Sequence, residues 1–169
     1  MTEPALDGGP DDPANPPPLR VGDRAPRFAL DGIDGATGAA GRWDSDDFRG
    51  KPLIVAFYPA DNTPVCTQQL LSYTSDIAML ESTGVQLVAV SPQDPASHRS
   101  FAEAQGGFAF PLLSDVDKGV GRAYGILGLM DLYRRSTFVL DADGVVLYAH
   151  RAVGPGLSFR HLDELLSHL

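Results

Sequence analysis

Apolar residues from Pro52 onward fall into short continuous runs that are separated by amphipathic segments. Runs of this kind, bounded by Pro, Gly or Asp, are typical of strands that are covered on both faces. They predict strands at Leu53–Tyr58, Val85–Ser91, Ser136–Leu140 and Val145–His150, with a short extended segment at Phe108–Leu113. Asp-Gly at 143–144 favours a hairpin between the last two strands. A short strand at Phe28–Leu30 precedes a Gly/Ala-rich hairpin or loop, Asp31–Arg42.

Helical spacing appears between these runs. Cys66, Leu70, Tyr73, Ile77 and Leu80 are three or four residues apart and predict one helix that Gly84 closes. Further helices are expected at Pro95–Ala104 with Asp94 as its cap, at Val116–Tyr124, and at Ser158–Leu169 with Ser158 as its cap. Two parallel strands first, an antiparallel hairpin later and helices between them predict an α/β fold, with a mixed central sheet flanked by helices.

The domain is expected to span residues 20–169. Residues 1–19 hold six of the fourteen prolines, together with Asp and Gly, and almost nothing apolar, so they are interpreted as a disordered tail.

The only cysteine lies just inside the start of a predicted helix. Thr63 suits the N-cap and Pro64 the first helical position, so Cys66 falls at the third position. There the unpaired N–H groups and the helix dipole favour a thiolate, the nucleophilic form of cysteine. The alternative is that Cys66 is a small buried apolar residue, the commoner use of a lone cysteine.

Charge and composition exclude several classes of function. A net charge of −9 and a pI near 4.7 argue against a nucleic-acid surface. A single cysteine forms no internal disulfide, the first residues have no signal-peptide pattern, and no apolar run reaches about 18 residues. We therefore expect a cytoplasmic protein without a membrane span. His98, His150, His161 and His168 have no metal-ligand spacing, so we expect no metal and no cofactor.

The segment around Cys66 resembles the active-site signature of the peroxiredoxins. Pro59, Thr63 and Cys66 match P-x-x-x-[TS]-x-x-C, and Phe57–Pro64 is similar to the bacterioferritin comigratory protein (PrxQ) branch of the AhpC/TSA family. Later blocks match in order, and they are Ser97–Phe101, Phe110–Asp115, Tyr124–Gly125 and Arg135–Phe138 with Asp141 and Gly144. The resemblance covers about residues 20–169 and implies a thioredoxin-like fold.

The same resemblance implies a role for each matching residue. Cys66 attacks the peroxide and becomes a sulfenic acid. Thr63 hydrogen-bonds the reacting atoms, although as an N-cap its hydroxyl could instead accept from the Cys66 N–H. Pro59 shapes and dries the pocket. Arg135 stabilises the thiolate and donates to the peroxide, with its neighbour Arg134 as the rival for this role.

Two departures from the family bear on the reaction cycle. Many members of this branch carry a resolving cysteine five residues after the first, where this chain has Leu71. The chain is thus expected to be of the 1-Cys type, reset by an external thiol such as thioredoxin, glutaredoxin with glutathione, or another low-molecular-weight thiol. Ser72–Ser75 also replaces the Phe-Arg-Asp often found after the helix start, so we assign no network there.

Four functions follow from these residues. The first is a peroxidase that reduces hydrogen peroxide and organic hydroperoxides, as a monomer or weak homodimer. The second is a peroxide sensor or relay that passes the oxidation of Cys66 to a partner protein. The third is a structural module or chaperone with an unreactive thiol. A Cys–His hydrolase is a fourth, but it needs one of the histidines beside Cys66, and we interpret all four histidines as surface or structural.

Overall fold

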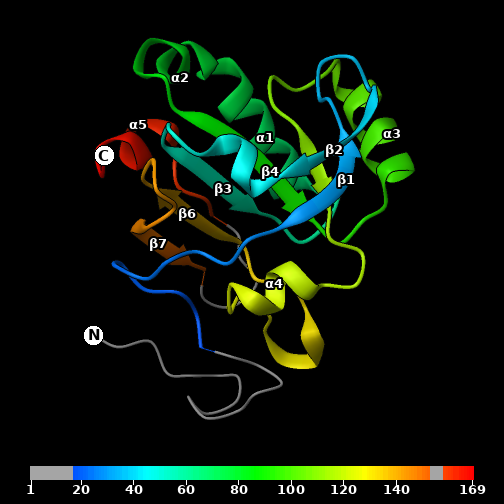
Figure 1. Cartoon of the computed structure of the whole chain (residues 1–169). Coiled ribbons are helices and arrows are strands. Elements are labelled where there is room, and N and C mark those ends of the chain that lie inside the picture. The colour runs from blue at the N-terminus through cyan, green and yellow to red at the C-terminus, as the bar shows by residue number, and fades with distance from the viewer. Residues whose placement is uncertain (1–16, 153–157) are drawn as a thin grey trace.

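The computed structural model describes residues 17–152 and 158–169, which form one mixed sheet with helices on both faces (Figure 1). The sheet has seven strands in the order β2-β1-β5-β4-β3-β6-β7. Their bounds are Ala29–Ile33 (β1), Ala40–Asp44 (β2), Leu53–Phe57 (β3), Gln86–Ser91 (β4), Leu112–Ser114 (β5), Ser136–Leu140 (β6) and Val146–Arg151 (β7). Strands β3, β4 and β5 are parallel, and both edges are antiparallel. This confirms the predicted α/β class.

The predicted strands agree with the observed ones to within a few residues. Strand β6 has the predicted bounds, and the Gly/Ala-rich segment forms the hairpin between β1 and β2. Gly144 has a φ of 85° in the turn between β6 and β7, which is why glycine suits that position. Residues 17–19 are the only described part of the predicted tail, and the Leu19 N–H donates to Tyr124 O at 3.3 Å. Residues 1–16 lie outside the described part of the chain.

The last two helices are shorter than predicted, and the helix that begins at Pro95 extends one residue further than predicted, to Gln105. Their bounds are Pro64–Ser75 (α1), Ile77–Thr83 (α2), Pro95–Gln105 (α3), Gly119–Ala123 (α4) and Leu162–Leu166 (α5), with single 3-10 turns at Ser45–Phe48 and Leu129–Asp131. Helix α3 begins as predicted, because Asp94 Oδ1 accepts from the Ser97 N–H at 2.8 Å. Gly84, with a φ of 72°, ends α2 as predicted.

Two helix predictions are wrong. The single helix expected from Pro64 to Gly84 is broken at Asp76, where the end of α1 is tied to another segment: Thr74 Oγ1 accepts from the Ala109 N–H at 3.2 Å. Ser158 does not cap the last helix, whose N-cap is His161. The segment before it is held by tertiary contacts instead, since the Tyr73 hydroxyl donates to Arg160 O at 2.6 Å and the Tyr73 ring packs on Phe159.

The sheet is buried on both faces, as the continuous apolar runs predict. On one face Ile54, Ala56 and Tyr58 pack against side chains from α1, α2, α3 and α5. On the other face Leu53, Val55 and Phe57 pack against the segment around α4 and against Phe28. Complete burial of an apolar side chain contributes about 1.5–3 kcal/mol. Strand β3 therefore anchors the sheet, and its carboxyl end is a rigid support. None of the helices in the described ranges is long and apolar enough to span a bilayer.

We predict that Gly32→Ala destabilises the protein by more than about 2 kcal/mol, because overpacking of backbone cannot be relieved by a rotamer change. A Cβ at Gly32 would lie 2.4 Å from the Leu112 carbonyl oxygen. Gly41 pairs directly with Gly32 across the hairpin, and a Cβ there meets only the Trp43 ring. Gly41→Ala is the control and should lower the free energy of unfolding by less. Urea unfolding measures the free energy of unfolding of both variants, and equal losses would contradict this packing.

Candidate active site

Cys66 lies one turn into α1, at the carboxyl end of β3. Thr63 has the extended dihedrals of an N-cap, Pro64 takes the first helical position, and Cys66 follows on the buried face of the helix. The side chain is only 1% exposed, and Leu70 and Tyr73 on the same face are also buried. The predicted stripe thus points the thiol into the molecule, next to the end of the central strand.

The pairing of two sheet strands brings Arg135 next to the thiol. Strands β3 and β6 are antiparallel, with Phe57 paired to Ser136, so the residue before β6 lies beside the end of β3. Arg135 Nη2 donates to Cys66 Sγ at 3.1 Å. The arginine is 4% exposed, and a buried guanidinium needs an acceptor of opposite or partial negative charge. The Cys66 sulfur accepts this hydrogen bond, and hydrogen bonds of this kind are stronger where the acceptor is ionised.

Gln69 and Tyr73 hold the other side of the guanidinium. Arg135 Nη1 donates to Gln69 Oε1, and Gln69 Nε2 donates to the Tyr73 hydroxyl at 3.2 Å. Burial raises the pKa of Tyr73 to about 12, so its hydroxyl keeps the proton that it donates to Arg160 O. This chain of hydrogen bonds restricts the rotation of Arg135. Gln69 has no predicted role, although a polar residue three positions after Cys66 lies on the same side of a helix.

Thr63 makes a different hydrogen bond from the one that an N-cap side chain makes. Its hydroxyl donates to the Ala60 carbonyl oxygen at 2.9 Å, and its side chain caps no N–H of the helix. The alternative in which Thr63 binds the Cys66 N–H is therefore wrong for this structure. A hydroxyl whose proton is donated elsewhere presents its lone pairs as acceptors. Pro59 and Thr63 are both half-buried, in the turn that joins β3 to α1.

The Arg134 side chain packs along the loop that contains Gly128. The Arg134 N–H donates to Ile126 O at 3.0 Å, and its side chain runs along Gly128, so that a Cβ added to this glycine would lie 3.2 Å from Arg134 Cγ. The structure therefore brings Cys66 and Arg135 together and places Arg134 against another loop. Leu71, five residues after Cys66, is partly buried against the core.

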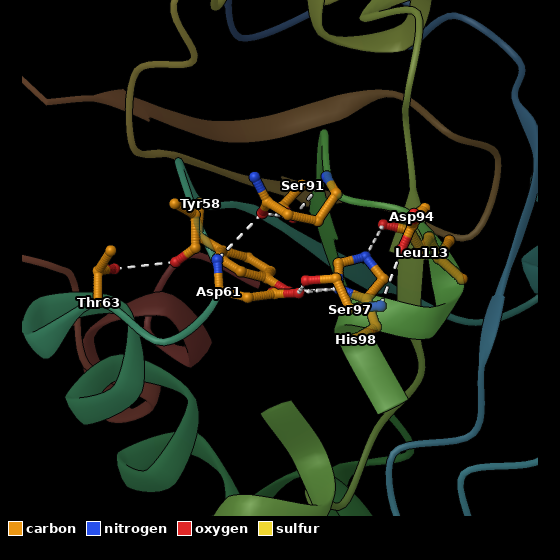
Figure 2. A network of polar contacts seen from close by, with 10 residues as sticks. Tyr58, Asp61, Thr63, Ser91, Asp94, Ser97, His98 and Leu113 are labelled. Carbon is orange, nitrogen blue, oxygen red and sulfur yellow. Dashed lines mark hydrogen bonds and ion pairs between the residues drawn. The ribbon is translucent and has the colours of Figure 1, made fainter. Parts of the chain in front are cut away.

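The histidines differ in their surroundings. His161 and His168 are exposed, and the His168 ring stacks on Tyr148 with centroids 3.9 Å apart. His150 is half-buried on β7 and lies 3.5 Å from Arg160 Nη2. His98 is fully buried, and its ring contacts Tyr58, Asp61 and Leu113 (Figure 2). Within the described residues no three His, Cys, Asp or Glu side chains gather as a metal site requires.

The Tyr58 hydroxyl takes part in the contacts around His98, 3.3 Å from Nδ1 of its ring. Its pKa is raised well above its ordinary value, first by burial, then by the charge of Asp61, and to a smaller extent by Cys66. The Tyr58 hydroxyl therefore stays protonated and donates to Asp61 Oδ1 at 2.7 Å. Sequence reasoning assigned no role to Tyr58, Asp61 or His98, although all three fall in or beside the matching blocks.

This arrangement fits nucleophilic attack on a small molecule that carries a weak bond. A thiolate is a nucleophile, and guanidinium N–H groups beside it can stabilise negative charge on a departing oxygen.

Comparison with known proteins shows to which family the chain is similar. The AhpC/TSA family matches residues 21–149. A Mycobacterium tuberculosis protein named as a candidate peroxiredoxin is 38% identical over 138 residues, which cover 78% of this chain and 84% of that protein.

Two solved structures are similar. AhpC of Mycobacterium tuberculosis has a TM-score of 0.81 at 25% identity and covers 90% of this chain and 92% of its own. The bacterioferritin comigratory protein of Xanthomonas campestris, also named peroxiredoxin Q, has a TM-score of 0.66 at 30% identity and covers 74% and 81%. The predicted thioredoxin-like fold is thereby confirmed.

The family match spans most of the chain, and these relatives and structural neighbours all carry names of this family. The chain belongs to the AhpC/TSA family and is a peroxiredoxin, a thiol-dependent peroxidase, with one cysteine.

Proposed function

We propose that Cys66 is the peroxide-reactive thiol of this peroxiredoxin, and that Arg135, Thr63 and Pro59 complete its active site. The observation that carries the proposal is the 3.1 Å contact between Arg135 Nη2 and Cys66 Sγ inside the protein. The substrates are hydrogen peroxide and organic hydroperoxides. The Xanthomonas protein is described as having alkyl peroxide reduction activity, which supports the second class of substrate.

The oxidation step transfers one oxygen atom to sulfur. The Cys66 thiolate attacks the terminal oxygen of the hydroperoxide, the O–O bond breaks, and Cys66 becomes a sulfenic acid. The departing alkoxide or hydroxide takes a proton from water and leaves as an alcohol or water. Arg135 N–H groups stabilise the charge on the reacting oxygens, Thr63 orients the peroxide through its hydroxyl, and Pro59 limits access of water.

The reduction step needs a thiol from outside the chain. One external thiolate attacks the Cys66 sulfur, displaces hydroxide and forms a mixed disulfide. A second thiolate attacks the external sulfur of that disulfide, which releases the Cys66 thiolate and an external disulfide. The single cysteine of the sequence supports this 1-Cys cycle, with thioredoxin, glutaredoxin with glutathione, or another low-molecular-weight thiol as the reductant.

The proposal extends to the compartment, the oligomeric state and the catalytic domain of the protein. We propose a cytoplasmic peroxidase that works as a monomer or weak homodimer, with residues 20–169 as its catalytic domain. The lack of an internal disulfide supports a reducing compartment. Analytical ultracentrifugation of the full chain measures the oligomeric state directly.

Arg135→Ala should slow the oxidation of Cys66 by roughly 10- to 100-fold, because a hydrogen bond to a charged group contributes about 1.5–3 kcal/mol and each ~1.4 kcal/mol is tenfold. The measurement is rapid-quench reaction with one equivalent of hydrogen peroxide, followed by dimedone trapping and mass spectrometry. The control is Arg134→Ala, whose side chain lies along Gly128 and should change the rate less than about twofold. Equal effects of the two substitutions would reject the assignment of Arg135.

Thr63→Val should also slow oxidation by roughly tenfold or more, since it removes the hydroxyl and keeps the shape. Thr63→Ser should retain most of the rate. Thr67→Val is the matched control, because the Thr67 hydroxyl donates only to the Thr63 carbonyl oxygen among the contacts described for it. If Thr63→Val and Thr67→Val react like the unmodified chain, Thr63 has no part in the reaction.

Turnover should require an added thiol. Oxidised protein is incubated with glutathione, or with a thioredoxin whose resolving cysteine is replaced by serine, and its intact mass is measured without reduction. A mixed disulfide at Cys66, followed by recovery of the free thiol with the complete reductant, is the expected result. Rapid formation of the sulfenic acid that none of these thiols reverses would instead favour the sensor or relay function.

A further inference from the structure

A cluster of polar side chains joins the turn between β3 and α1 to helix α3 (Figure 2). We define it as Tyr58, Asp61, Ser97 and His98. Asp61 is the centre of the cluster: Oδ1 accepts from the Tyr58 hydroxyl at 2.7 Å, and Oδ2 accepts from the Ser97 hydroxyl at 2.8 Å and lies 2.8 Å from His98 Nδ1. The side chains of His98 and Asp61 are 0% and 2% exposed. Such a cluster is costly to bury unless each polar atom has a partner.

Every partner of the carboxylate in this cluster is a donor. His98 Nε2 lies 3.0 Å from the Leu113 carbonyl oxygen, which can only accept, so Nε2 carries a proton. Nδ1 lies 2.8 Å from Asp61 Oδ2, whose oxygen accepts. The Asp61 carboxylate is therefore held by hydrogen bonds from three side chains, those of Tyr58, Ser97 and His98.

Two further hydrogen bonds, both to residues outside the cluster, hold the turn on either side of Pro59. The Tyr58 N–H donates to Val90 O at 2.9 Å, and the Asp61 N–H donates to Gln93 Oε1 at 3.0 Å. The next residue, Asn62, has a φ of 59°, in the left-handed region that a non-glycine residue adopts at a cost. Such a backbone persists only where its surroundings hold it. Asp61 connects the turn to α3 and to the end of β4, and Thr63 follows directly.

We propose that Asp61 and His98 are positioning residues of the peroxidase reaction. Their pair ties the turn at residues 58–63 to α3, and this sets the Thr63 hydroxyl and Pro59 at the place where the peroxide meets Cys66. The inference rests on the proposed roles of Cys66 and Thr63. Neither positioning residue touches the reacting atoms. A displacement of the turn by about 1 Å is sufficient to slow such a reaction by up to about 10²-fold.

Two reactions of the same thiol test this role. Oxidation by hydrogen peroxide depends on the turn, whereas alkylation by iodoacetamide reports the nucleophilicity and accessibility of Cys66 without using Thr63. In Asp61→Ala the ratio of peroxide rate to alkylation rate should fall by roughly 10- to 100-fold. Asp61→Asn keeps an acceptor for the Tyr58 hydroxyl and the shape of the side chain, so it should restore most of the ratio.

Two further variants complete the design. Asp94→Ala is the matched control. It removes the side chain that caps α3 by accepting from the Ser97 N–H, and it destabilises the same helix by about 1 kcal/mol. The ratio of peroxide rate to alkylation rate should stay unchanged. Gln93→Ala removes the acceptor of the Asp61 N–H at a half-buried position. It should lower the ratio even if Asp61→Ala fails to fold.

The outcomes separate this inference from the proposed function. If the unmodified protein itself reacts no faster with peroxide than a free thiol, the proposed function fails and the ratio has no meaning. If the unmodified protein reacts rapidly but Asp61→Ala and Gln93→Ala keep its ratio, or lower it no more than Asp94→Ala, the positioning role is overturned.

Discussion

The hydrogen-bonded contact between the Arg135 guanidinium and the Cys66 sulfur is the interaction on which this site depends. Both groups are buried, so each needs the other: the guanidinium needs an acceptor, and the thiolate needs a positive neighbour. The contact joins residues that are 69 positions apart in the sequence. The sheet makes it possible, because antiparallel pairing of β3 with β6 places Ser136 opposite Phe57. The contact between Arg135 and Cys66 therefore requires the register of the central strands, as the fold does.

Polar contacts on two sides keep this pair in place. On one side a chain of hydrogen bonds through Gln69 and Tyr73 fixes the guanidinium. This chain ends at the Arg160 carbonyl oxygen, just before α5. On the other side the cluster of Tyr58, Asp61, Ser97 and His98 supports the turn from β3 into α1. Figure 2 shows that this cluster draws its side chains from that turn and from α3. The two networks begin on different elements, and they restrict the movement of Arg135 on one side and of the turn that leads to α1 on the other.

Local signals predicted the parts of this structure that local physics controls. The buried run of β3, the Pro64 helix start, the Asp94 cap and the Gly84 helix end each depend on a few neighbouring residues, and all are present. The break at Asp76 and the late start of α5 depend on contacts of Thr74 and Tyr73 with distant segments, so helical spacing alone did not predict them.

The residues of the candidate site likewise divide into those that local sequence predicts and those that only the fold brings together. Cys66, Thr63, Pro59 and Arg135 were predicted from the helix start and the family signature, and the structure brings Arg135 to the thiol. Gln69 and the pair of Asp61 with His98 were not assigned, since a polar residue acquires such a role only when folding buries it beside a partner from another element. His98 lies in a matching block on a predicted helix, but its complete burial beside Asp61 is visible only in the folded structure.

We expect folding, by bringing Arg135 to Cys66, to make an ordinary thiol react rapidly with peroxide. The most direct test compares the second-order rate of Cys66 oxidation by stoichiometric hydrogen peroxide in the folded chain and in the same chain unfolded in urea at the same pH. We expect the folded chain to react faster by at least about 10²-fold, the effect of one preorganised charge-stabilising group. Equal rates in the two states would contradict the account.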